Sequence, residues 1–366
     1  MSYPDKILQL AGGSHQDILA KLEDKQAATI VSSWQQARVD IEKRITSLYD
    51  RTFAAGATPT PAQLLQFTRD GELVAGIDAH LDALGVKTQG AQTGGFSAGA
   101  ALAKEQLSVE MSPLYHDFGH ALPSAVSFAR LDNVVYDLGM TRAINETPNM
   151  VAEVRSAVHR ELAAGAIAGE GIKELAARIE PMSGIGANRA DIISRYAVIS
   201  GHNAAREQAY ADAVPAIPGL QKMWLVTRDE RTCPLCLAHW GEAVPVEAEF
   251  DHERTFGTTA PKIYGGTLSH PPLHPRCRCT ITTWHPRWYG LTDLTPEFYQ
   301  EEAQKLAIQA GLPSKTFAQE IPPVSGLRAT RAGRNVLRAS EIKSVPPAVR
   351  QAYIDKFFSC FGGKSA

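Results

Sequence analysis

The fold is decided by the stretch that begins Asp229-Glu230-Arg231-Thr232-Cys233-Pro234-Leu235-Cys236 and ends Pro271-Pro272-Leu273-His274-Pro275-Arg276-Cys277-Arg278-Cys279. Four of the five cysteines of the chain lie in its two end clusters. A CxxC pair and a CxC pair separated by a loop-like segment can surround one tetrahedral metal ion, because Zn–S bonds of about 2.3 Å let two short cysteine turns face each other. The rest of the chain is therefore interpreted as the body to which this module is attached.

Four thiolates complete a closed tetrahedral shell with no position left for a substrate, so the pattern predicts a structural Zn²⁺ site. The predicted ligands are Cys233, Cys236, Cys277 and Cys279. His274 is an alternative ligand, since Pro272 and Pro275 would present its ring rigidly. A third interpretation is a set of packed free thiols or a labile disulfide. Structural zinc contributes on the order of 10 kcal/mol, so the module should lose its fold without the metal.

The composition places limits on the whole chain. Its 366 residues, 44% of them hydrophobic, are enough for two or three structural units with a proper core. A net charge of −2 argues against a protein that binds nucleic acid over its whole surface. The N-terminus has no secretory pattern, and no apolar run reaches the roughly 18 residues of a membrane span. We expect a protein of the reducing cytosolic side, where clustered cysteines favour metal over disulfides.

Two strands are predicted beside the cysteine clusters. Lys222-Met223-Trp224-Leu225-Val226-Thr227 leads into the first cluster, and Thr280-Ile281-Thr282-Thr283-Trp284 leaves the second. Both are rich in β-branched and aromatic residues. Strands that enter and leave one metal site should pair, which predicts a small β-ribbon or sheet.

Elsewhere the apolar residues recur every three to four positions, which predicts helices. We expect short helical pieces before a helix that starts at Ser32 or Ser33, and an interruption at Gly71. Other expected features are a helix end at Gly85, a loop over 90–99, a helix over about 98–111, one from Pro123 to Gly139, another after Pro148, and further helices over 172–179, 184–213 and from Thr295. The fold class is α+β, mainly helical, with a small zinc-stabilised β-containing module near residues 220–285.

His116 and His120 lie four residues apart, like the two histidines of the metalloprotease helix. The base position between them is Asp117, and Gly119 weakens the helix that this spacing requires. We therefore interpret the segment as a connector.

A basic stripe is predicted near the C-terminus, where four arginines would share one face if the segment were helical. They are Arg328, Arg331, Arg334 and Arg338. The stripe is either a solvated or partner-docking face or a contact for DNA or an acidic protein.

Several of these features together resemble a known family, the minor head proteins of tailed bacteriophages in the Mu F-like head morphogenesis group. They are Ile193-Ser194-Arg195, Asn203-Ala204-Ala205-Arg206, Trp224, Asp229-x-Arg231-Thr232-Cys233-x-x-Cys236, Gly241 and Pro271-Pro272-Leu273-His274-Pro275-x-Cys277-Arg278-Cys279. The resemblance covers about residues 145–285. Family members often carry Arg-Thr-Glu where this chain has Arg195-Tyr196-Ala197, so no role of that acidic residue is carried over.

The resemblance implies a minor capsid protein that acts in head assembly, associates with the portal and takes part in DNA packaging or ejection. It implies the portal protein and the major capsid or scaffolding protein as partners, with phage DNA as a further candidate and no membrane. The protein would be found in the virion, and in the host cytoplasm during assembly. We divide the chain into a helical N-terminal region (1–145), a Mu F-like domain (146–285) and a C-terminal region of helix and linker (286–366).

Two other classes of function stay open. One is an enzyme, such as a nuclease, protease or transferase, carried by the flanking regions. The sequence shows no Gly-rich phosphate loop, no nucleophile elbow and no well-spaced acid pair, so we predict that the protein is not an enzyme. The other is a zinc-ribbon module that binds nucleic acid, which the near-neutral charge disfavours.

Overall fold

The computed structural model describes residues 2–53, 58–122, 125–179, 181–227, 232, 234–250, 269–273, 277–309, 328–329 and 335–336. The chain forms two compact units, which we treat separately. The sheet unit comprises Met1–Leu22, Phe96–Val135 and Arg195–Ala366. The helical unit comprises Glu23–Gly95 and Tyr136–Ser194.

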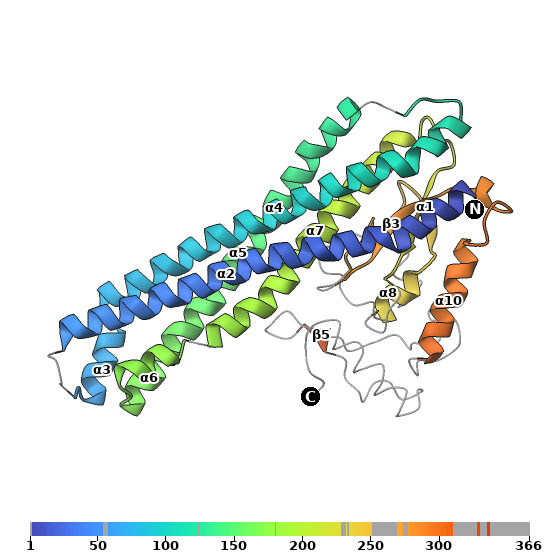
Figure 1. Cartoon of the computed structure of the whole chain (residues 1–366). Coiled ribbons are helices and arrows are strands. Elements are labelled where there is room, and N and C mark those ends of the chain that lie inside the picture. Colours follow the sequence, from blue (N-terminus) through green and yellow to red (C-terminus); the bar gives the residue numbers. More distant parts are fainter. Residues whose placement is uncertain are drawn as a thin grey trace. The chain divides into compact units, whose positions relative to one another are not determined.

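The first seven elements are all helices: α1 (Tyr3–Gly12), α2 (Ser14–Thr52), α3 (Pro61–Thr68), α4 (Gly71–Asp117), α5 (Ala125–Ala168), α6 (Ile172–Ala177) and α7 (Pro181–Ala213). The remaining elements are β1 (Gln221–Leu225), α8 (Pro234–His239), β2 (Ala243–Pro245), β3 (Thr280–Trp284), the 3-10 helix η2 (Pro286–Trp288), α10 (Pro296–Gln309), β4 (Arg328–Ala329) and β5 (Asn335–Val336). The predicted fold class, mainly helical with a small β-containing module, is confirmed (Figure 1).

The sheet of the sheet unit has the strand order β2-β1-β3 and is antiparallel throughout. The two strands expected from the sequence do pair, with Trp224 opposite Ile281 and Met223 opposite Thr282. The short strand β2 was not expected, because its three residues carry no periodic pattern. Within the described residues β3 is therefore an edge strand, and its outer edge needs hydrogen-bond partners from elsewhere.

Aromatic side chains fill the core of the sheet unit. The tryptophans Trp224, Trp240, Trp284 and Trp288 are all buried there. Helix α1 closes one end of this core with Ile7 and Leu8, and the indole Nε1 of Trp288 donates a 2.9 Å hydrogen bond to the Tyr3 hydroxyl. The start of the chain is thus fixed to the segment that follows β3.

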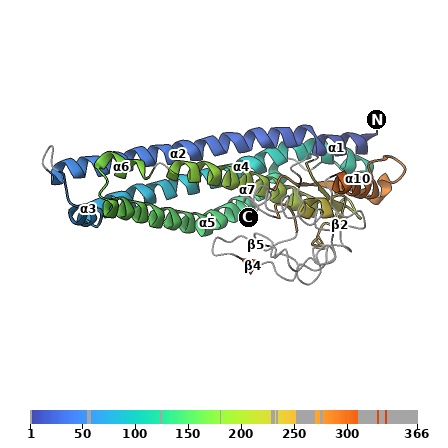
Figure 2. The same cartoon turned by 90° about the horizontal axis from the view of Figure 1, so that it is seen from below.

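The core of the helical unit is formed by one face of each of its long helices. Leu81 and Leu84 of α4 pack with Val151 and Val154 of α5, and with Ile41 of α2. A smaller cluster joins α3, α6 and the C-terminal part of α5, which lie at the same end of the unit (Figure 2). Regular heptad-like burial of this kind makes a helical bundle independent of local helix propensity.

The expected start of a helix at Ser32 or Ser33 is wrong, since α2 is continuous from Ser14. The only break in this region is at Gly13, between α1 and α2. Leu19, Ile30 and Trp34 are buried at helical spacing on both sides of the expected start, so tertiary packing extends the helix through a polar stretch.

The expected helix end at Gly85 and loop over 90–99 are also wrong, because α4 runs unbroken from Gly71 to Asp117. Gly99 of α4 and Gly201 of α7 instead allow close packing within the sheet unit. A Cβ atom on Gly99 would lie 2.1 Å from the carbonyl oxygen of Val198, and one on Gly201 would lie 2.0 Å from that of Phe96. Helices α4 and α7 therefore approach backbone to backbone where these two glycines lie.

The expected break between Gly139 and Pro148 is absent, since α5 continues through both positions. Pro148 removes one backbone donor but does not end the helix. Val151, Val154, Val158 and Leu162 are all buried just beyond it, and the hydroxyl of Thr147 donates a 2.6 Å hydrogen bond to Gln92 of α4. Packing again outweighs a local signal.

The interpretation of His116 and His120 as a connector holds in part, because His116 lies in the last turn of α4 and His120 lies beyond the end of that helix. Helix α4 ends at Asp117, and Gly119 has a φ of +75°, so the two histidines do not share a helical face. The expected helices over 172–179, over 184–213 and from Thr295 correspond to α6, α7 and α10, with α7 starting three residues earlier.

Candidate metal centre and the helix that holds it

Three cysteines meet beside the sheet. Cys236 lies on α8, while Cys277 and Cys279 lie in the segment that leads into β3. Their sulfur atoms are all within 4.8 Å of one another, and the Sγ atoms of Cys236 and Cys277 are 3.7 Å apart. Two thiolates on one tetrahedral zinc, each at about 2.3 Å, would be separated by about 3.8 Å. The spacing therefore fits a shared metal ion, and it is far too long for a disulfide.

The burial of the cluster shows what such a site could do. The three cysteines are only 1–3% exposed. The sulfur ligands of a metal held there would be shielded from solvent. Buried thiolate ligands are typical of metal sites that stabilise a fold, whereas catalytic metal sites keep a position for substrate or water.

The predicted ligand set is thus brought together in part. Among the described residues the cluster consists of Cys236, Cys277 and Cys279. Cys233 and the alternative ligand His274 lie outside the described residues. The three observed sulfurs fit the thiolate chemistry of a structural metal site, and they leave one coordination position to be supplied.

Hydroxyl groups tie the segments around the cluster to the sheet. Thr227, just after β1, donates a 3.0 Å hydrogen bond to the carbonyl oxygen of Arg278, between the two cysteines of the CxC pair. Thr232 in turn donates to the carbonyl oxygen of Thr227. The chain that leaves β1 and the chain that enters β3 are in this way held side by side at the cluster.

Helix α7 supplies the partners that the outer edge of β3 requires. Trp224 directs its backbone toward β2, through bonds to Gly241 and Glu242, so Ile281 opposite it directs its own backbone away from β1. The side-chain amide of Asn203 donates to the carbonyl oxygen of Cys279 at 3.1 Å and accepts from the N–H of Ile281 at 3.0 Å. A single side chain on α7 thus pairs with the strand as a neighbouring strand would.

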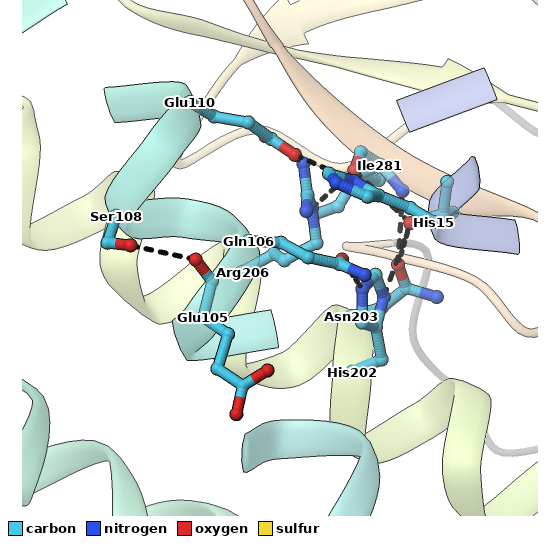
Figure 3. A network of polar contacts seen from close by, with 10 residues as sticks. His15, Glu105, Gln106, Ser108, Glu110, His202, Asn203, Arg206 and Ile281 are labelled. Atoms are coloured by element: carbon cyan, nitrogen blue, oxygen red, sulfur yellow. Dashed lines mark hydrogen bonds and ion pairs between the residues drawn. The ribbon is translucent and has the colours of Figure 1, made fainter. Parts of the chain in front are cut away.

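The guanidinium of Arg206 continues this edge one helical turn further on. Its Nε donates a 2.7 Å hydrogen bond to the carbonyl oxygen of Ile281. Its Nη2 donates to Glu110 of α4, and both side chains are fully buried (Figure 3). His15 of α2 lies on the other oxygen of Glu110, with its Nδ1 3.2 Å away. A buried ionic network therefore joins three helices to β3.

The network determines the charge states of its members. Burial alone would raise the pKa of Glu110, but Arg206 and His15 outweigh this effect and the pKa is lowered below its ordinary value. Burial disfavours the charged form of Arg206, yet Glu110 raises the pKa of the guanidinium further. Glu110 and Arg206 are therefore both ionised at neutral pH.

A second polar branch runs from β3 to α4. The hydroxyl of Thr280 donates to Oδ1 of Asn203 at 2.9 Å and lies 3.4 Å from Nδ1 of His202. Nε2 of His202 is 2.8 Å from Oε1 of Gln106 (Figure 3). Burial lowers the pKa of His202 well below its ordinary value, so the ring is neutral and donates from Nε2 to Gln106.

Gly241 fixes the other side of the sheet. Its φ is +80°, and a Cβ atom there would lie 2.4 Å from the carbonyl oxygen of Pro296 and 2.8 Å from Cβ of Tyr299. Only glycine satisfies both the turn and the close approach of α10. Helix α10 is therefore seated against the β1–β2 connection.

Sequence reasoning missed most of the polar network. The family pattern includes Asn203 and Arg206 but gives them no role, and no sequence motif points to Glu110, Gln106 or His15. The available signal was the presence of Asn203 and Arg206 three residues apart on a helix otherwise lined with alanine, which places both on one buried face.

Of the four arginines of the predicted basic stripe, the structure describes Arg328 alone. Arg328 lies in the two-residue strand β4, paired with β5, and not in a helix. Arg331, Arg334 and Arg338 lie outside the described residues. A shared helical face therefore does not include Arg328.

Comparison with known families now adds a relationship to this geometry. Residues 156–282 match the family described as Phage Mu protein F like protein. The matched part contains α7, β1, β2, the first three residues of β3 and all three clustered cysteines, and it confirms the resemblance seen in the sequence. It relates this part of the chain to a family of phage head proteins.

The other comparisons returned no relative. No curated protein and no solved structure matches the chain. In the described part of the chain, each helix is either too short or too polar to cross a membrane.

Proposed function

We propose that the protein is a minor head protein that acts in phage head assembly, and that it works as a structural component and not as an enzyme. The observation that carries the proposal is the family match over residues 156–282, which coincides with the cysteine cluster and the α7 residues that hold it. The described cysteines of this centre are buried, and Asn203 and Arg206 of α7 bond to the backbone at β3, which suits a building block better than a catalyst.

The proposed metal is Zn²⁺. Three thiolates at a spacing that fits tetrahedral geometry favour zinc, because it accepts an all-thiolate tetrahedral shell and carries out no redox chemistry there. Cys236, Cys277 and Cys279 would hold it, with Cys233 as the proposed fourth ligand and His274 as the alternative. The ion would stabilise the sheet unit and supply no reaction chemistry.

The proposed partners follow from the proposed role. They are the portal protein and the major capsid or scaffolding protein, with phage DNA as a further partner during packaging or ejection. The four arginines Arg328, Arg331, Arg334 and Arg338 are the proposed contact for DNA or an acidic protein. The proposed location is the virion, reached from the host cytoplasm during assembly.

Mass spectrometry of purified heads tests the role. Heads are prepared from the phage that carries this gene, together with heads from a deletion and from a complemented strain. We expect the chain in wild-type heads at a copy number far below that of the major capsid protein, and chemical cross-links to the portal protein. Its absence from heads, with the intact chain free in the lysate, would contradict the proposal.

Two matched variants test whether incorporation into heads depends on the fold of the sheet unit. Cys277→Ser with Cys279→Ser removes two proposed ligands and should abolish incorporation, because the sheet unit would not form. Glu72→Gln alters a solvent-exposed ion pair with Arg44 and Arg51 in the helical unit, and should leave incorporation unchanged. If the protein were instead an enzyme, heads would take up the double cysteine variant at the wild-type level although its sheet unit is unfolded, and these heads would lose a chemical activity.

A further inference from the structure

The side chain of Asn203 is placed to control the position of a metal ligand. Its amide bonds to the carbonyl oxygen of Cys279 and to the N–H of Ile281, so it grips the backbone on both sides of Thr280. Cys279 is one of the three clustered cysteines. Rotation of its backbone would move its sulfur, and the amide of Asn203 opposes that rotation directly.

The Asn203 amide is itself fixed in one orientation. Thr280 donates to its Oδ1 at 2.9 Å, which adds a second donor to the Ile281 N–H on the same oxygen. Asn203 is fully buried, so water does not compete for these bonds. With both donors on Oδ1, the Nδ2 group faces the carbonyl of Cys279.

Asn203 is equally constrained at its backbone. It projects from the part of α7 whose backbone packs closely on α4 at Gly201, and its neighbour Arg206 is held by Glu110. Groups that orient metal ligands in this way are typically worth 10–100-fold in metal affinity. The geometry therefore connects the cysteine cluster to a rigid crossing of two helices.

We propose that Asn203 is a positioning residue of the cysteine metal site, which holds Cys279 in the register required to share one ion with Cys236 and Cys277. This inference rests on the metal site proposed above. It goes beyond that site because it assigns to α7, which supplies no ligand among the described residues, control over how tightly and with what geometry the metal is held.

Metal affinity and ligand geometry are measured on the full-length chain. Zinc affinity is obtained by competition with a chromophoric chelator, and ligand geometry from the absorption spectrum of the Co²⁺-substituted protein, which reports thiolate number and tetrahedral distortion. Asn203→Ala should weaken zinc binding 10–100-fold and change the Co²⁺ spectrum. Leu107→Ala, which truncates a fully buried core residue of the same unit, is the control for a general loss of stability.

The control should leave zinc affinity within about threefold of wild type, with an unchanged Co²⁺ spectrum. Should Asn203→Ala fail to fold, Asn203→Asp retains the shape and the acceptor for Ile281 but loses the donor to Cys279, and should show the same two effects. Wild-type affinity and an unaltered spectrum in whichever of these variants folds would overturn the proposal. A wild-type chain that binds neither metal would overturn the metal site and this inference together, whereas a chain that binds metal but is absent from heads would affect only the assembly role.

Discussion

Arg206 and Glu110 form an ion pair inside the sheet unit, although 96 positions separate them in the sequence and their side chains are only 1% and 0% exposed. Burying two charges is costly, and it is compensated here because each charge has a second partner. Arg206 also donates to Ile281, and Glu110 also contacts His15. The pair consequently links α4 and α7 to β3, the strand that begins directly after Cys279.

Replacing Glu110 by Gln should destabilise the protein strongly. The substitution retains the shape but leaves the charge of Arg206 buried and uncompensated, which costs about 3–5 kcal/mol. Equilibrium unfolding in urea at neutral pH measures the loss. Glu72→Gln, which breaks an exposed ion pair, should cost a small fraction of it. Equal losses of stability for the two substitutions would contradict this prediction, because they would show that the charge of Arg206 is compensated even without the Glu110 carboxylate.

The contribution of Glu110 should depend on pH in a defined direction. Its pKa is lowered in the folded protein from an ordinary value of 4.5, so its stabilising effect is fully present above about pH 4.5 and is lost as the pH falls through the lowered pKa. The difference in unfolding free energy between the wild type and Glu110→Gln should be constant from about pH 6 to 8 and narrow below about pH 4.5. A difference that widens on acidification would contradict the sign of this effect.

Alanine at Gly99 or Gly201 should push α4 and α7 apart. The added Cβ would lie 2.0–2.1 Å from a backbone carbonyl oxygen, which cannot rotate away, and overpacking of this kind costs about 1–3 kcal/mol or more. Gly90 and Gly94 on the same helix have no atom within 4 Å of such a Cβ, so alanine there should stabilise the helix by about 0.5–1 kcal/mol. Thermal unfolding of the four variants tests the contrast, and a shared direction of change would be inconsistent with the close crossing.

Removal of metal should unfold the sheet unit before the helical unit. Four of the five tryptophans are buried in the sheet unit, so a chelator should shift tryptophan emission to longer wavelength while much of the helical circular dichroism is retained. Added Zn²⁺ should restore the emission, and added Mg²⁺ should not, because thiolates do not favour a hard cation. Unchanged emission at full chelation would mean that the sheet unit folds without metal.

The parts of the fold that the sequence predicts correctly are those with a short-range cause. The strands β1 and β3 were recognised because β-branched and aromatic residues adjoin the cysteine clusters, and their pairing followed from a shared end point. The proline at the start of α10 likewise acts on its immediate neighbours.

The usual local effect of glycine and proline predicts breaks that the long helices α4 and α5 do not have. In α4 the glycine of the crossing allows a close backbone contact, and in α5 the buried valines beyond Pro148 hold the helix together. Both effects depend on residues far away in the chain. A single sequence contains no such information.

The cysteines are the part of the candidate site that can be predicted from the sequence, since their spacing is itself the signal for a metal. The residues that hold these cysteines in place cannot be predicted in the same way. Asn203 bonds to a carbonyl 76 residues away, and Glu110 meets its arginine 96 residues away, so neither role is expressed in local spacing. An isolated polar pair on an alanine-rich helix indicates only that some buried partner exists.

Native mass spectrometry of the purified full-length chain, before and after denaturation in the presence of a chelator, measures most directly whether the cysteine cluster holds a structural ion. One zinc ion per folded chain is expected, lost on denaturation, with Cys236, Cys277 and Cys279 protected from alkylation until the ion leaves. A folded, metal-free chain prepared in zinc-containing buffer, which takes up no ion and keeps the same melting temperature with and without chelator, would contradict it.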